Sequence, residues 1–171
     1  MYISTTKLSY PISLPTDELF IKRSLAIYTD ETDDNSFVNS LLESATDFTE
    51  GQINQDIAYS NNVVNLYDFS GDELLIRKGN FNSITSIVNN DTSTLISDFE
   101  TIKSYDNMVI EFDESITSDS LTITFTTGWD NIDDIPKGLK LAIVCKTKAL
   151  YDNDEKMNDT WIRYCQQYKL L

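Results

Sequence analysis

One run of acidic residues has a spacing close to that of a known calcium-binding loop. Residues 30–34 (Asp-Glu-Thr-Asp-Asp) place oxygen ligands at alternate positions, as the calcium loop of an EF-hand does. The sixth position is then Asn35 rather than the glycine that the turn requires, and the twelfth is Leu41 rather than a bidentate glutamate. We therefore interpret this loop as solvated, with acids that cap the next helix. We predict no metal site here or in the similar run 152–159.

The sequence offers little to a catalytic mechanism. It contains no histidine, which removes the commonest general base and the commonest metal ligand. Its five glycines are scattered and form no phosphate-binding loop. Two carboxylates can hydrolyse a glycosidic bond, but nothing among the 28 acidic residues selects a pair. We expect no catalytic residue and no cofactor, with a small two-carboxylate hydrolase as an open alternative.

Composition limits the partners and the compartment. A net charge of −15 in 171 residues argues against a protein that grips nucleic acid through its phosphates, although a DNA mimic stays possible. Cys145 and Cys165 fit no metal spacing, and neither a secretory signal nor a long apolar run is present. We expect one domain in a reducing compartment, away from membranes, with both thiols as small core residues.

The elements that must position these residues fall into an α+β pattern. Helical spacing of apolar residues predicts helices over 17–26 and 37–55, the second with Phe37, Leu42 and Phe48 on its apolar side. Alternation then predicts strands, joined by turns at 70–72, 89–91 and 106–107 into an antiparallel meander with the helices on one side of it. The predicted strands are 63–69, 74–77, 83–89, 99–104, 108–112 and 121–127.

A further helix follows the last strand. Asp133, Asp134 and Pro136 mark its start, because acids and proline favour the first turn of a helix. Its basic side chains are unusual for so acidic a protein, since Lys137, Lys140 and Lys148 share one face with Leu141 and Val144. Either these lysines extend to water from a central helix, or their face binds an acidic neighbouring subunit.

The C-terminal segment carries large apolar groups at helical spacing. Trp161, Tyr164 and Tyr168 lie on one stripe, with Arg163 beside it. Either this helix completes the core of its own domain, or it docks into a partner, because aromatic residues and arginine are enriched at binding hot spots. We predict an extended arm over 1–13, an α+β domain over 14–155 and a C-terminal docking helix over 156–171.

A series of short motifs lies in order between Leu14 and Glu155. The motifs are Lys22-Arg23-Ser24-Leu25, Asp33-Asp34, Ser83-Ile84-Thr85-Ser86-Ile87, Thr127-Gly128-Trp129, Pro136 and Tyr151-x-Asn153-x-Glu155. In this order they resemble the head–tail connector (head-completion adaptor) proteins of tailed bacteriophages. The resemblance implies a structural virion protein at the head–tail interface, assembled in the host cytoplasm. It implies a homo-oligomeric ring, a dodecamer, that binds below the portal protein, extends the DNA channel and joins the tail or stopper protein.

The resemblance also gives the C-terminal segment a role. It implies that Trp161, Tyr164 and Tyr168 anchor the chain to the portal or to an adjacent subunit, while DNA passes through the ring without specific binding. The alternative from another class is a monomeric β-rich module that binds carbohydrate or protein through exposed tyrosine and tryptophan.

Overall fold

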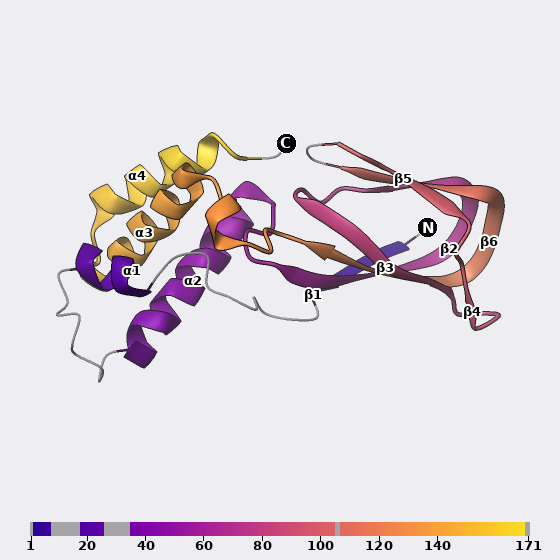
Figure 1. Cartoon of the computed structure of the whole chain (residues 1–171), viewed down its shortest axis with the longest axis horizontal. Helices are drawn as coiled ribbons and strands as arrows, with labels where there is room; N and C mark the ends of the chain where they lie inside the picture. The colour runs from indigo at the N-terminus through magenta and orange to yellow at the C-terminus, as the bar shows by residue number, and fades with distance from the viewer. Residues whose placement is uncertain (1, 8–17, 26–34, 105–106, 170–171) are drawn as a thin grey trace. The chain divides into compact units, whose positions relative to one another are not determined.

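The computed structural model describes residues 2–7, 18–25, 35–104 and 107–169. They form two compact units. The sheet unit comprises the described residues of 1–12 and 59–128, and the helical unit comprises those of 13–58 and 129–171. The α+β class is confirmed. Figure 1 shows the strands grouped in one sheet and the helices grouped with one another.

The sheet unit has six strands in its described residues, and every pair of strands in the sheet is antiparallel. The longest strand, β6, pairs with β2 on one side and with β3 on the other, while β1 lies outside β2 and β5 pairs with the first half of β6 (Figure 1). The strands are β1 (Tyr2–Lys7), β2 (Ser60–Ile76), β3 (Phe81–Asn89), β4 (Thr94–Leu95), β5 (Phe99–Lys103) and β6 (Met108–Thr127).

Two long strands replace four of the predicted short ones. The predicted turn at 70–72 lies inside β2, where the register with β6 shifts between Gly71 and Glu73. The polar segment 113–120 likewise lies inside β6, and Thr117 and Ser118 pair with Ser70 and Phe69. These polar residues continue the backbone ladder while most of their side chains face water, so their composition resembles that of a turn. The order is accordingly not a simple meander, because β2 pairs with β6 rather than with β3.

The turn predicted at 89–91 is confirmed. Residues 89–91 begin the turn between β3 and β4, where Asp91 N–H donates to Asn89 Oδ1 at 3.0 Å. Asn90 Nδ2 also donates to the Ser120 and Thr122 hydroxyls at 2.8 and 2.9 Å, which ties this turn to β6. The predicted turn at 106–107 falls between β5 and β6, although Asp106 itself lies outside the described residues.

Part of the predicted N-terminal arm belongs to the sheet. Residues 2–7 form β1, which pairs along its whole length with residues 62–67 of β2. Residues 8–13 lie outside the described residues. Pairing with β2 gives the backbone N–H and C=O groups of this segment their hydrogen-bonding partners.

The sheet buries its own apolar face. Alternate residues of β2 and β6 point inward, as the period-two pattern of the sequence predicts. Phe81 stacks on Phe125 with ring centroids 4.9 Å apart, so β3 contributes to the same cluster. Its fully buried members include Leu66, Ile87, Met108, Ile110, Leu121, Ile123 and Phe125.

The helical unit contains α1 (Glu18–Ser24), α2 (Asn35–Ile53), the 3-10 turn η1 (Ile132–Asp134), α3 (Lys137–Asp152) and α4 (Glu155–Gln166). Pro136 immediately precedes α3, as the sequence predicts. Asn153 ends α3 in the left-handed conformation, and the Asp154 side chain then accepts hydrogen bonds from the N–H groups of Lys156 and Met157. This cap separates α3 from α4 within two residues. No helix among the described residues is long and apolar enough to cross a membrane.

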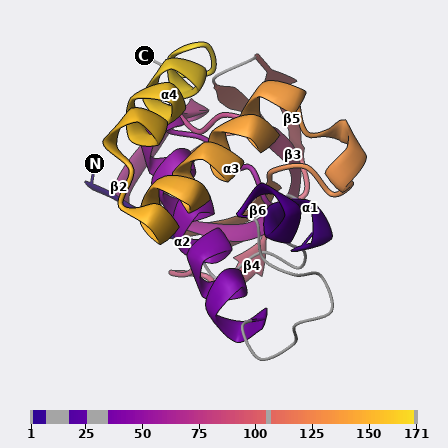
Figure 2. The same cartoon turned by 90° about the vertical axis from the view of Figure 1, so that its left-hand side faces the viewer.

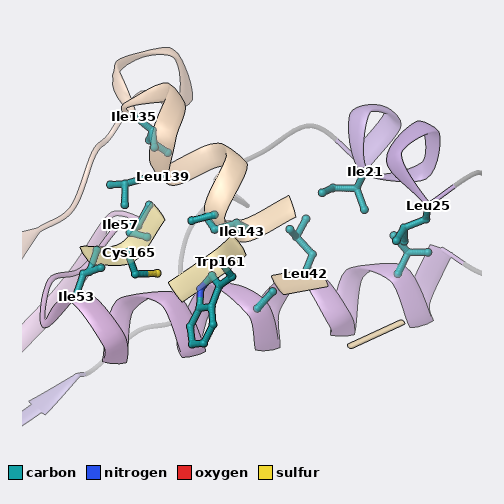
Figure 3. Close-up of a cluster of buried hydrophobic side chains, with 13 residues drawn as sticks. Ile21, Leu25, Leu42, Ile53, Ile57, Ile135, Leu139, Ile143, Trp161 and Cys165 are labelled. Carbon is teal, nitrogen blue, oxygen red and sulfur yellow. The ribbon is translucent and has the colours of Figure 1, made fainter. Parts of the chain in front are cut away.

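The helices have a core of their own. α3 contacts α1, α2 and α4, and Figure 2 shows it between α1 and α4. Figure 3 shows Leu42 of α2, Ile143 of α3 and Trp161 of α4 converging in one cluster. The buried apolar side chains of the helices form a cluster distinct from that of the sheet. Because α3 is apolar nearly all round, its neighbouring helices can cover much of its surface.

Truncation of Leu42 should destabilise the helical unit. The side chain is fully buried, so Leu42→Ala should lower the free energy of unfolding by about 2–5 kcal/mol. Glu43→Ala, one position away and exposed, should change it by less than about 0.5 kcal/mol. Urea unfolding followed by tryptophan fluorescence measures both, because both tryptophans lie in the helical unit. An unchanged midpoint for Leu42→Ala would contradict the assigned core.

Candidate interaction surfaces of the helical unit

Trp161 is a core residue. Its side chain is only 7% exposed, and its indole Nε1–H donates to the Thr49 hydroxyl of α2 at 3.0 Å. A buried indole whose N–H already has a partner in its own unit offers nothing to a second protein. The expected role of Trp161 as an anchor in a partner is therefore corrected: for this residue, the core alternative holds.

Lys146 lies against two aromatic rings. Its ammonium Nζ is 4.1 Å from the ring centroid of Trp161 and 4.6 Å from that of Phe48, and it donates to Asn158 Oδ1 at 2.8 Å. Burial lowers the pKa of Lys146. The aromatic faces and the amide oxygen are attractive partners for the ammonium group at this half-buried position. These contacts explain how a lysine occupies the apolar arc of α3. They also join α2, α3 and α4.

The other aromatic residues of the predicted anchor, Tyr164 of α4 and Tyr168 just beyond its end, are partly buried. Tyr164 and Tyr168 pack against the helical core, and Gln55 Nε2 donates to the Tyr168 carbonyl at 2.6 Å. A Cβ atom on Gly138 would lie 2.5 Å from the Tyr168 hydroxyl, so the absence of a side chain there lets the tyrosine approach α3. The close approach at Gly138 has no signature in the sequence. Arg163 is exposed.

The two thiols are uncharged groups of the same unit. Cys165 is fully buried, and burial raises the pKa of its thiol to about 11. Cys145 is half-buried, and burial raises the pKa of this thiol as well. Since the thiolate is the reactive form, neither environment activates a nucleophile. Cys165 is a small core residue, as the sequence indicates.

The predicted lysine face exists on α3. Lys137 is exposed, Lys140 and Lys148 are half-exposed, and Leu141 between them is 40% exposed. Val144 lies among these lysines and is partly buried against the core, so part of this side of α3 is covered. The buried residues Leu139, Ala142, Ile143 and Ala149 lie away from these lysines, whereas buried Thr147 lies beside Lys140 on the helix.

The exposed side of α2 carries two large aromatic side chains. Helical spacing predicts Phe37 and Phe48 on the apolar side of this helix, but each is 53% exposed. Phe37 pairs with Tyr151 of α3, itself 40% exposed, with ring centroids 6.2 Å apart. Their spacing puts them at the edge of the apolar arc, where the helical period alone does not distinguish buried from exposed.

The acidic motifs show no metal site in the described part of the chain. Residues 30–34 lie outside the described residues. In the run 152–159, Asp154 caps α4 instead. Among the described residues, no three or more cysteine, aspartate and glutamate side chains cluster as ligands would.

The fold is shared with proteins of gene transfer agent (GTA) particles. One similar chain comes from the neck of an empty GTA particle computed with C6 symmetry, with a TM-score of 0.81 at 12% identity, over 98% of this chain and 96% of that one. A chain of the native GTA virion has a TM-score of 0.81 at 14% identity, over 98% and 95% of the two chains. A chain from the native neck computed with C12 symmetry has a TM-score of 0.72 at 12% identity, over 98% and 96%.

No protein-family model matches the chain, and no curated protein matches it. At 12–14% identity, the likeness to the particle proteins shows the fold. It extends over both units, because nearly the whole of each chain is covered.

The two predicted roles of α4 lead to opposite results on substitution. Trp161→Ala should lower the free energy of unfolding by about 3–5 kcal/mol, because it removes a buried ring. Arg163→Ala, on the exposed side of the same helix, should change it by less than about 0.5 kcal/mol. Deletion of residues 158–171 should unfold the helical unit for the same reason. Circular dichroism during thermal unfolding measures all three, and a stable truncated protein would show that α4 is dispensable to the core.

Proposed function

We propose that this protein is a structural subunit of the neck of a phage-like particle, a head–tail connector with no catalytic activity. The observation that carries the proposal is the likeness of fold to neck chains over 98% of this chain. The ordered motifs of the sequence support the same family independently of the fold. On this proposal the protein resides in the virion and passes through the host cytoplasm during assembly.

A ring is the form that this role requires. The similar neck structures were computed with C6 and C12 symmetry, which supports a cyclic arrangement of identical subunits. We propose a ring, a dodecamer, that binds the portal protein on one side and a tail or stopper protein on the other. DNA then passes through the ring.

Charge supports a channel through which DNA slides. The segments that form the sheet unit contain only four basic residues, Lys7, Arg77, Lys78 and Lys103, among many more acids. Acidic walls repel phosphates, whereas clustered lysines and arginines would bind them and hold the DNA in place.

The C-terminal segment keeps a smaller role than the sequence implies. Because Trp161 is buried, contact with the portal falls to the residues of the C-terminal segment that are open to solvent. On α4, Arg163 is exposed and Tyr164 is partly buried, and Tyr168, just beyond the end of α4, is also partly buried. These three residues are the part of the predicted anchor that we retain.

The alternative is a monomeric binding module. It draws on an apolar groove of about 260 Å³ along β2, lined by Val64, Leu66, Leu74 and Ile76, with Arg77 and Lys78 also in its wall. This volume is near the lower limit for a small-molecule site. A module of this kind would stay monomeric whether or not a portal is present.

Assembly with a portal separates the two proposals. The chain should be monomeric or weakly associated alone, since its net charge of −15 opposes self-association. Co-expressed with the portal of its own particle, it should form rings on that template, and raised salt should favour rings by screening the repulsion. Native mass spectrometry and negative-stain microscopy measure both. A chain that remains monomeric with its portal at every ionic strength is not a connector.

Duplex DNA should not bind measurably to the protein at physiological salt. The physical reason is the excess of acidic side chains, which repels the phosphates of DNA. A gel mobility-shift titration tests this, with a basic DNA-binding protein as positive control. Tight binding that weakens steeply with salt would contradict the proposed channel.

A further inference from the structure

The two largest helices of the helical unit differ in the sign of their charge. From Lys137 to Leu150, α3 has four lysines and no acid. Over its whole length from Asn35 to Ile53, α2 has neither lysine nor arginine but includes the exposed acids Glu43 and Asp47. A chain with a strong acidic excess has therefore gathered basic residues on one helix and excluded them from its neighbour.

The charged faces lie on two helices that share one core. α2 and α3 contact one another, and each contributes buried residues to that core, among them Leu42 of α2 and Ile143 of α3. We call the lysine-bearing side of α3 the basic face (Lys137, Lys140, Leu141 and Lys148) and the exposed side of α2 the acidic face (Phe37, Glu43, Asp47 and Phe48). The edges of the acidic face contact α3, since Phe37 pairs with Tyr151 and Phe48 lies beside Lys146.

The acidic face is shaped for close approach. Small residues run along it between the two phenylalanines, and the Ser40 and Ser44 hydroxyls bond back to the carbonyls of Ser36 and Ser40 at 2.9 and 2.8 Å. Their hydrogen-bonding capacity is thereby partly used within the helix. A Cβ atom built on Gly51 would meet nothing within 4 Å, so the surface is open there. Short, self-satisfied side chains allow another helix to come near without leaving polar groups unpaired.

The apolar residues of the two faces also match. Leu141 is 40% exposed among the lysines, and Phe37 and Phe48 are each 53% exposed beside the acids. Each face thus combines exposed apolar groups with charge of one sign. Exposed apolar residues ringed by polar ones are typical of protein interfaces.

We propose that the basic face of one copy of this chain binds the acidic face of the next copy around the ring. The proposal rests on the proposed connector function and names the surfaces that hold its ring together. In a cyclic assembly of more than two subunits, each contact joins two different patches of the same chain, and this unit carries two patches of opposite charge on α3 and α2. The complementary charges offset the repulsion between acidic subunits. A partner of another kind would need only one of the faces.

Two charge-reversed variants test the pairing. Lys140→Glu with Lys148→Glu makes both faces acidic, and Glu43→Lys with Asp47→Lys makes both faces basic. Each variant alone should assemble on the order of tenfold or more less readily than the wild type, because like charges then meet at every contact. Mixed in equal amounts, the two variants should assemble again as rings of alternating subunits, since every contact then joins opposite charges.

The readout is the concentration at which rings form, measured by mass photometry with and without co-expressed portal. Lys156→Glu with Lys169→Glu is the matched control for Lys140→Glu with Lys148→Glu, because these exposed lysines lie outside both faces and give the same change in net charge. Thermal unfolding confirms that each variant is folded. Rescue by mixing supports the proposal.

The possible failures are distinguishable. If the wild type forms rings and each single variant forms them equally well, the faces are wrong and the connector function stands. If the variants are defective but mixing does not restore rings, the pairing of these two faces is likewise overturned. If the wild type forms no ring under any of these conditions, both the connector function and the interface are overturned.

Discussion

The helical unit depends on the burial of α3, whose apolar side chains occupy most of its circumference. One helix cannot shield such a surface, so α1, α2 and α4 all contact it. The lysines of α3 are restricted by the same packing. Lys146 lies on the inner side and is held over two aromatic rings, whereas Lys137 is left on the outer side. The distribution of charge on the unit therefore follows from which residues the core requires.

The sheet unit depends in the same way on β6. This strand supplies the partner for β2, β3 and β5, and its inward residues Leu121, Ile123 and Phe125 are fully buried. Because β6 pairs on both sides, the backbone groups of its second half are satisfied within the sheet. The polar segment between its two apolar halves keeps the strand continuous. Without that continuity, β5 and β3 would have no common partner.

A connector proposal is compatible with this division into two cores. A sheet and a helical unit that are each internally packed provide separate surfaces for separate neighbours, as a protein between head and tail requires. Within the helical unit, the basic and acidic faces occur on two helices that pack against one another. The core that stabilises the unit thereby also holds the two charged surfaces in place.

Several features could be predicted from the sequence alone. Hydrophobic periodicity predicted α2 within two residues at each end, and alternation predicted the inward residues of β6. Pro136 predicted the start of α3, whereas Asp133 and Asp134, expected in its first turn, lie in the separate turn η1. These features are local: each depends on side chains within a few residues of one another, so the pattern contains the information. The lysine face of α3 could be predicted for the same reason.

Only the tertiary structure decided the rest. Whether Trp161 enters its own core or a partner depends on Thr49, far away in the sequence, which accepts its indole N–H. Phe48 and Phe37 follow the same helical period as Leu42, yet they are exposed because the neighbouring helices cover only part of the arc. The polar segment of β6 is a strand because β2 pairs with it, although its composition is that of a turn. Burial and strand pairing depend on residues far away in the sequence. A local pattern does not specify which of those residues will pack or pair with it.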